Sequence, residues 1–173
     1  FNHNKIEEFK VANYIPEGFT PLTRKNRSEA IMDLTNKKAP ELNLIDSDNN
    51  PISLRNFNSK VILIQFTGIG CGFCHLSVPF LKNLPNDYTP DDLDLIAVET
   101  WSNDPEVVKR YISNNKINYP YLLSTDEYKK LYQISGVPVF FILDENRIIR
   151  KIIRGYSKDS TDKEIRDAIN ALI

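Results

Sequence analysis

Almost continuous apolar runs recur along the chain and predict the strands of an α/β fold. The runs at 61–66, 93–98 and 139–143 have the length and composition of buried strands. Residues 41–45 alternate between polar and apolar positions and are a weaker strand candidate. Residues 147–154 mix isoleucine with lysine and arginine, and such charges favour an exposed edge strand, where they discourage pairing with other chains.

Apolar residues at helical spacing lie between and after these strands. The run at 75–81 predicts a helix that contains Pro79, which removes a backbone hydrogen bond and bends the helix. Residues 104–105, Asp-Pro, are typical of a helix start, and 124–127 and 161–164 match the capping boxes of two further helices. Because strands and helices alternate, we expect parallel strands joined by helical crossovers.

The first part of the chain has no comparable pattern. We therefore expect an N-terminal extension or linker over residues 1–38 and one folded domain over residues 39–173. The chain begins with Phe1 rather than methionine, which favours a processed form that has lost a signal or membrane-anchor segment.

Composition narrows the range of partners. Of the 173 residues, 41% are hydrophobic and 26% are charged, as in ordinary globular domains. The formal net charge is −1, so nothing indicates nucleic acid or an anionic membrane surface as a partner. No apolar stretch is long enough to cross a bilayer. We also expect the protein to be a monomer.

The candidate chemistry lies in the only two cysteines, Cys71 and Cys74, between the first strand and the first helix. Two cysteines are too few for a disulfide framework in a chain of this length, so a chemical role explains them better. A helix N-terminus presents unpaired N–H groups and favours negative charge, which stabilises the thiolate of Cys71. That thiolate attacks disulfides, and Cys74, one helical turn further on, can then attack the mixed disulfide.

The elements around the Cys-Gly-Phe-Cys segment 71–74 resemble the thioredoxin fold from residue 39 to the C-terminus. Pro79 stands where that family has its helix-bending proline, and the Gly-Val-Pro segment 136–138 is similar to its cis-proline element. The resemblance implies a central mixed β-sheet flanked by helices, with Val137 and Pro138 beside the cysteines and in contact with bound substrate. An X–Pro bond adopts the cis form at little cost, so this is physically reasonable.

The segment from Ala39 to Val61, with its polar turn, is similar to the extracytoplasmic TlpA/ResA-like branch of the thioredoxin-like superfamily. Members are thiol–disulfide oxidoreductases, commonly anchored to a membrane, and several reduce disulfides in client proteins, including apocytochromes awaiting haem. The resemblance therefore implies disulfide-containing clients, an upstream thiol donor, and a place in the periplasm or on the outer face of a membrane. No metal, nucleotide or flavin cofactor is needed, because sulfur carries both electrons.

Several positions depart from the family pattern. Gly70 replaces the tryptophan that usually precedes the first cysteine, and Thr67 replaces an aromatic residue at the end of the strand. Gln65 and Ser77 stand where thioredoxin and the ResA-like branch have acids that help to move the proton of the resolving cysteine. The Gly-Ile-Gly loop at 68–70 is expected to be bare and flexible. The reduction potential and the client therefore stay open, as does the choice between reductase, oxidase and isomerase.

Further candidate residues surround the cysteines. Gly72 and Phe73 are expected to contact substrate, and Phe73 also to offer an apolar surface and influence the potential. His75 can tune the thiolate or carry a proton, although a solvated position on the helix is favoured. Glu99 can replace a missing acid, although an exposed loop carboxylate is favoured. Partly buried packing is favoured over surface contact for two aromatic residues near strand ends, Trp101 and Tyr156.

Four other interpretations share some of these features. A zinc site needs four ligands, and the chain has only two cysteines and two histidines, His3 among them. The Cys-x-x-Cys-His pattern at 71–75 matches c-type haem attachment, with His3 or Met32 as second axial ligand, but a preceding sheet strand argues against it. A peroxiredoxin-like peroxidase shares the fold but has a threonine in place of Gly68 and no resolving cysteine at this spacing. The intact cysteine pair argues against a non-catalytic binding module.

Overall fold

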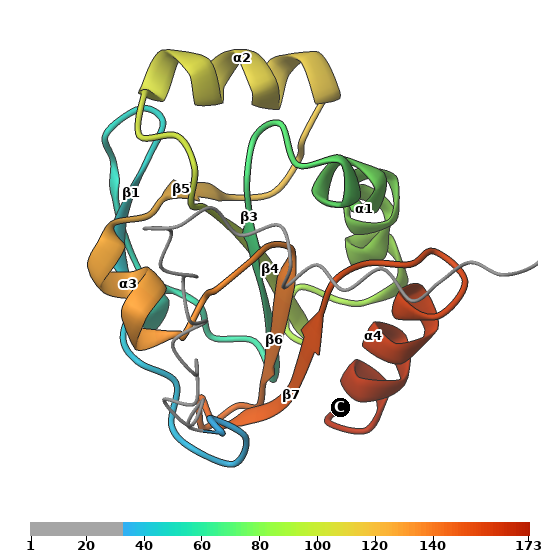
Figure 1. Ribbon diagram of the computed structural model, residues 1–173. Coiled ribbons are helices and arrows are strands. Elements are labelled where there is room, and N and C mark those ends of the chain that lie inside the picture. Colours follow the sequence, from blue (N-terminus) through green and yellow to red (C-terminus); the bar gives the residue numbers. More distant parts are fainter. Residues whose placement is uncertain (1–32) are drawn as a thin grey trace, which may run out of the picture. The chain divides into compact units, whose positions relative to one another are not determined.

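The computed structural model describes residues 33–173, which form one seven-stranded sheet with helices on both faces (Figure 1). The strands are β1 (Asn43–Asp46), β2 (Pro51–Ser53), β3 (Val61–Thr67), β4 (Leu93–Glu99), β5 (Tyr121–Leu123), β6 (Val139–Leu143) and β7 (Ile149–Arg154). The helices are α1 (Gly72–Asn83), α2 (Pro105–Asn115), α3 (Asp126–Leu131) and α4 (Thr161–Asn170), with short 3₁₀ turns η2 (Leu54–Asn56) and η3 (Leu84–Asp87).

The sheet order is β2-β1-β5-β4-β3-β6-β7. β3 and β4 run parallel through a helical crossover, as predicted, and β5 pairs parallel with β4. β6 lies antiparallel on the other side of β3, and β7 forms the predicted charged edge. Because β3 is central and covered on both faces, all seven of its residues are buried. The carboxyl ends of β3, β4 and β5 meet at one edge of the sheet, where Thr67, Glu99 and Leu123 stand in register.

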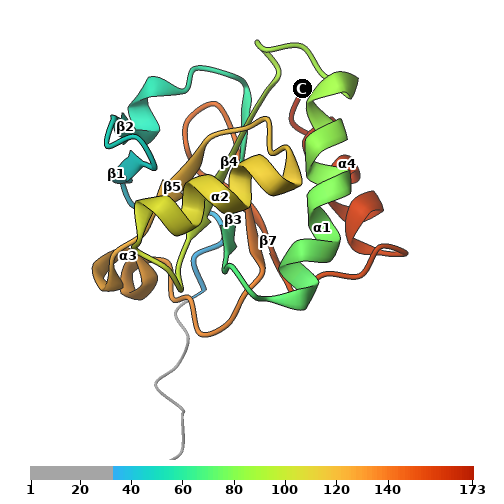
Figure 2. The same ribbon diagram turned by 90° about the horizontal axis from the view of Figure 1, so that it is seen from above.

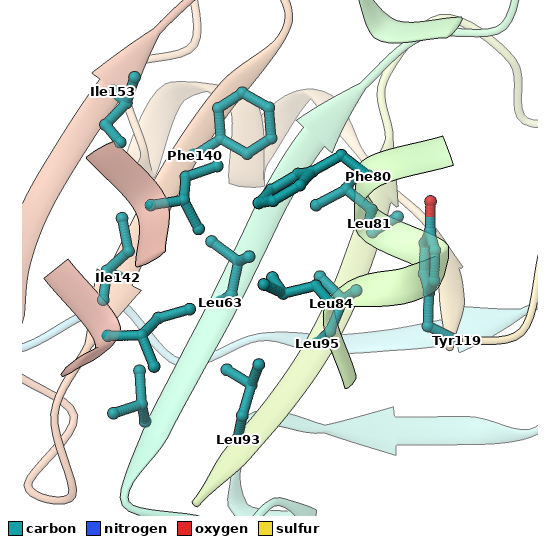
Figure 3. Close-up of a cluster of buried hydrophobic side chains, with 14 of the residues drawn as sticks. Leu63, Phe80, Leu81, Leu84, Leu93, Leu95, Tyr119, Phe140, Ile142 and Ile153 are labelled. Carbon is teal, nitrogen blue, oxygen red and sulfur yellow. The ribbon is translucent and has the colours of Figure 1, made fainter. Parts of the chain in front are cut away.

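Different elements cover the two faces of the sheet. α1, α2 and α4 pack on one face, for example through Val108 of α2 and Ile165 of α4. Figure 3 shows Phe80 of α1 and Leu84 of η3, the residue directly after α1, reaching towards Leu63 of β3 in this layer. α3 and the chain before β1 pack on the other face, and Figures 1 and 2 show α3 opposite α1 and α4. Apolar side chains on both faces of β3 explain why its sequence shows no polar alternation.

The predicted strands at 61–66, 93–98 and 139–143 are confirmed. β5 was not predicted, because three residues are too few to show a period. Asp104 begins α2 as predicted, and its Oδ1 accepts a hydrogen bond from the N–H of Glu106 at 2.9 Å. The two predicted capping boxes are wrong: the N-caps of α3 and α4 are Thr125 and Ser160, and neither side chain caps its helix.

Residues just before the predicted boundary at 39 already contact the sheet. The N–H of Asn36 donates to the carbonyl of Ile149 at 2.7 Å, and Lys38 forms an antiparallel bridge with Ile148. Leu34 is buried in the layer that α3 covers. The division into 1–38 and 39–173 stays a prediction. None of the helices in the described chain has the length and apolar character that a membrane crossing needs.

Candidate active site

The two cysteines lie at the N-terminus of α1, directly after the edge at which β3 ends. Cys71 is the N-cap residue of α1, and it forms a disulfide with Cys74, whose Cα atom lies 5.2 Å away. The Cys71 Sγ also accepts a hydrogen bond from the N–H of Cys74 at 3.2 Å. Cys71 is 7% exposed and Cys74 is 1% exposed, so the first sulfur is the more accessible. An N–H group directed at this sulfur also favours its thiolate after reduction.

Two prolines lie where the sequence predicts them. Pro79 is inside α1, and the bond between Val137 and Pro138 is cis. β6 begins at Val139, which pairs with Phe66 near the end of β3. This register brings the cis bond to the end of the sheet at which the cysteines lie. The carbonyl oxygen of Val137 lies 3.7 Å from the Cys71 Sγ. The fold therefore brings together two segments that are 66 positions apart in the sequence.

Gln65 and Ser77, which the sequence analysis compared with an acid of thioredoxin and an acid of the ResA-like branch, are in direct contact. Both are buried, with exposures of 1% and 0%. The Gln65 Nε2 donates to the Ser77 Oγ at 2.8 Å, and that hydroxyl donates to the carbonyl of Cys74 at 2.7 Å. Amide and hydroxyl groups do not ionise near neutral pH, so a neutral pair lies beside Cys74.

Glu99 is not the exposed loop carboxylate that the sequence favours. β4 extends to this residue, its side chain is fully buried, and its two oxygens accept hydrogen bonds from four groups. These are the N–H groups of Ile69 (3.0 and 3.1 Å), Trp101 (2.9 Å) and Ser102 (3.0 Å) and the hydroxyl of Tyr121 (3.0 Å). Charge-assisted hydrogen bonds of this kind compensate for the burial of a carboxylate. Burial and the nearby Glu99 carboxylate raise the pKa of Tyr121 far above its ordinary range.

The approach loop at 68–70 is not bare. The ring of Trp101 packs on Gly68 so closely that a Cβ there would lie 2.5 Å from a ring carbon. The N–H of Ile69 is held by Glu99, as described above. Gly70 has a φ of +92°, a conformation that side-chain-bearing residues rarely adopt. Trp101 is 60% exposed, so its predicted partial burial is wrong, whereas Tyr156 is buried.

The remaining candidates lie on the first turns of α1. His75 is exposed, as favoured from the sequence, and Phe73 is 63% exposed. Leu76, which the sequence analysis did not single out, is 61% exposed. Within residues 33–173, no group of three or more His, Cys, Asp or Glu side chains is arranged to hold a metal ion. His3 and Met32, considered for zinc or haem ligation, lie outside the described residues.

Residues 34–170 match the family described as Redoxin. The chain belongs to the Redoxin family. Thiol-disulfide oxidoreductase ResA from Bacillus thuringiensis subsp. konkukian is 23% identical to it over 151 residues, which cover 86% of each chain. The fold of this Redoxin family member and its predicted class, a TlpA/ResA-like thiol–disulfide oxidoreductase, are thereby confirmed.

Solved structures agree with this fold. A thiol:disulfide interchange protein from Bacteroides sp. has a TM-score of 0.67 at 24% identity, over 79% of this chain and 90% of that one. StoA from Bacillus subtilis has a TM-score of 0.62 at 23% identity, over 75% of this chain and 96% of that one. The Redoxin family assignment and these neighbours thus support the same thioredoxin-like architecture.

Proposed function

We propose that this protein exchanges disulfides with client proteins through Cys71 and Cys74, and that it acts as a reductase. One observation carries the proposal: the two sulfurs are bonded at the N-terminus of α1, and the more accessible one faces the carbonyl of Val137 beside a cis-proline. A polypeptide that binds along Val137 and Pro138 brings its own disulfide to Cys71. Gly72 and Phe73 then form the adjoining part of the contact.

The reaction begins from the dithiol form. The Cys71 thiolate attacks one sulfur of the client disulfide, a mixed disulfide forms, and the other client sulfur leaves as a thiolate. The Cys74 sulfur, as thiolate, then attacks the Cys71 Sγ, the mixed disulfide breaks, and the second client thiolate leaves. Two electrons and two protons pass from the enzyme to the client. The product is the disulfide form that the structure contains.

The buried side chains next to Cys74 supply no acid or base for the resolving step. The groups beside Cys74 are the neutral Gln65 and Ser77, so the Cys74 proton passes to the departing client thiolate or to solvent. His75, exposed one residue further on, is available for that transfer. We therefore expect slower resolution than in relatives that have the acid.

The partners follow from the same chemistry. Clients are proteins with accessible disulfides, and an upstream dithiol must reduce the Cys71–Cys74 bond after each turnover. The similarity to the ResA relatives supports a place outside the cytoplasm, where protein disulfides persist. Apocytochromes awaiting haem are one client class that this branch suggests.

A redox titration and an insulin-reduction assay test the proposal. In glutathione buffers the cysteine pair should titrate as a two-electron couple, and the reduced protein should reduce insulin catalytically with dithiothreitol as donor. Cys71→Ser should abolish turnover, whereas Cys74→Ser should accumulate a mixed disulfide that mass spectrometry detects. Full turnover by Cys71→Ser, or a pair that stays oxidised under strong reductant, would overturn it. Consumption of hydroperoxide without a disulfide client would instead support a peroxidase.

A further inference from the structure

Trp101 is the only tryptophan of the chain, and it lies on the approach to the disulfide rather than in the core. Its ring covers Gly68, and the Gly68 carbonyl accepts a hydrogen bond from the N–H of Cys71 at 3.0 Å. The indole therefore packs on the residue whose carbonyl holds the backbone of the attacking cysteine. With 60% of its surface exposed, it remains free to touch another molecule.

The buried carboxylate of Glu99 holds the ring in this place. One of its oxygens accepts from the N–H groups of Trp101 and Ser102 after β4, and both accept from the N–H of Ile69 after β3. A second link joins the same two segments, because the N–H and hydroxyl of Thr100 donate to the carbonyl of Thr67 at 2.9 and 2.7 Å. The loop that carries Trp101 and the loop that leads to Cys71 are thus both hydrogen-bonded to the Glu99 side chain.

A glycine at position 68 is what allows this packing. A Cβ there would approach three carbons of the indole to between 2.5 and 2.9 Å, so any other residue must displace the ring. Position 70 cannot easily carry an aromatic residue itself, because its φ is +92°. An aromatic surface before the first cysteine is therefore supplied from the loop after β4.

Two more exposed apolar side chains lie on α1, which carries Cys74 and begins directly after Cys71. Phe73 and Leu76 are 63% and 61% exposed on the first two turns of α1, and Trp101 is equally exposed at the preceding loop. Cys71 itself is only 7% exposed, so a client disulfide that reacts with its sulfur must come close to the residues around it. A polypeptide that covers one of these exposed aromatic side chains gains binding energy from its burial.

We propose that Trp101 is a specificity-determining residue for polypeptide clients, and that Glu99 is the positioning residue that holds it over Gly68. The inference rests on the proposed disulfide exchange and deepens it by assigning the client contact. The favoured client is a polypeptide with apolar residues next to its disulfide. Small disulfides have no polypeptide segment to place against the indole, so we expect them to gain little from it.

The test compares a protein disulfide with a small one. With dithiothreitol as donor, Trp101→Ala should lower kcat/KM for insulin about fivefold, mainly through a higher KM, and Trp101→Phe should restore part of it. The rate with hydroxyethyl disulfide should stay within about twofold of the wild type. Leu131→Ala, which removes an equally apolar exposed side chain from α3, should change neither substrate.

Two further variants and a control test whether the position of the indole ring matters, and not only its presence. Gly68→Ala leaves Trp101 and Glu99 intact but displaces the indole, and should raise the KM for insulin as Trp101→Ala does. Glu99→Gln replaces one accepting oxygen by an NH₂ group, which cannot accept a hydrogen bond from a loop N–H, and should weaken the reaction of Cys71 with both substrates. Tyr121→Phe removes one donor to Glu99 but no loop contact, so its rates with both substrates should match the wild type.

Trp101 also reports its own position by fluorescence, because a nearby disulfide quenches an indole. Reduction of the wild-type pair should raise the emission, and Gly68→Ala should diminish that response. Equal KM values for insulin in the wild type and Trp101→Ala, or an emission indifferent to reduction, would overturn the inference while disulfide exchange stands. Wild-type protein inactive with both disulfides would overturn the proposed function and this inference together.

Discussion

Two fully buried polar sites lie at the same edge of the sheet, and they are built in opposite ways. The Gln65–Ser77 pair is neutral, and one amide and one hydroxyl satisfy each other beside Cys74. Glu99 is a carboxylate that is held by three backbone N–H groups and one phenol. The ionisable group therefore holds the loops, whereas the buried side chains next to Cys74 are neutral.

Removing the carboxylate should have the largest effect of any change at these two sites. Glu99→Ala leaves three loop N–H groups and the Tyr121 hydroxyl without their acceptor, and we expect a loss of about 3–5 kcal/mol in the free energy of unfolding. Denaturant unfolding of the oxidised protein measures it. Glu145→Ala, at an exposed carboxylate in the turn after β6, is the matched control and should change stability by less than about 0.5 kcal/mol. Comparable losses in the two variants would contradict the role given to Glu99.

Placing an acid at the Gln65–Ser77 site should make that site depend on pH. Ser77→Glu puts a carboxyl next to Gln65, where burial raises its pKa above the ordinary value of about 4.3. A carboxyl with a raised folded-state pKa ionises first in the unfolded chain, so the variant loses stability as pH rises above that ordinary value. We expect about 2–4 kcal/mol less stability than the wild type at pH 7 and a smaller difference at pH 4.

The same variant tests the resolving step. If an acid near Cys74 helps to move its proton, the rate at which Cys74 resolves the mixed disulfide should gain a pH dependence that the wild type lacks. Rapid-mixing kinetics with a stable mixed disulfide follow this rate. A stability difference between variant and wild type that is constant from pH 4 to pH 8 would show that the introduced group is solvated rather than buried.

Removing one donor from Glu99 should show how much a single hydrogen bond contributes at that site. Tyr121→Phe withdraws one of four donors from a buried anion and should cost about 1.5–3 kcal/mol. Thermal and denaturant unfolding at the same pH provide the measurement. Tyr111→Phe is the control, because its ring packs at 5.9 Å from that of Tyr121 without a hydrogen bond to Glu99. A neutral outcome for Tyr121→Phe would mean that the N–H groups alone satisfy the carboxylate.

The smallest effect is expected at the neutral pair. Ser77→Ala leaves the Gln65 amide buried without its acceptor and should cost about 1–2 kcal/mol. The double variant Gln65→Leu with Ser77→Ala removes both polar partners, so it should be close to neutral despite two changes. A double variant less stable than Ser77→Ala alone would indicate that the pair stabilises the fold through packing rather than hydrogen bonding.

Local patterns predicted three strands and the place of the cysteine pair. The apolar runs that became β3, β4 and β6 were evident, as was the cysteine pair at a strand–helix junction, because each depends on neighbours in the sequence. Glu99 was misjudged because its burial depends on loops that follow two different strands. Trp101 was misjudged because Gly68, on which it packs, lies 33 positions away. No local pattern identifies either contact.

The amino-acid sequence alone determined the α/β alternation, the position of the two sulfurs at a helix start, and the absence of an acid at positions 65 and 77. These features follow from side-chain type and short-range spacing. Only the tertiary structure decided that the two non-acidic residues bond to each other, that Glu99 is buried, and that the single indole covers the approach to Cys71. Each of these depends on the strand register, which sets distant residues side by side and is specified by the packing of the whole sheet.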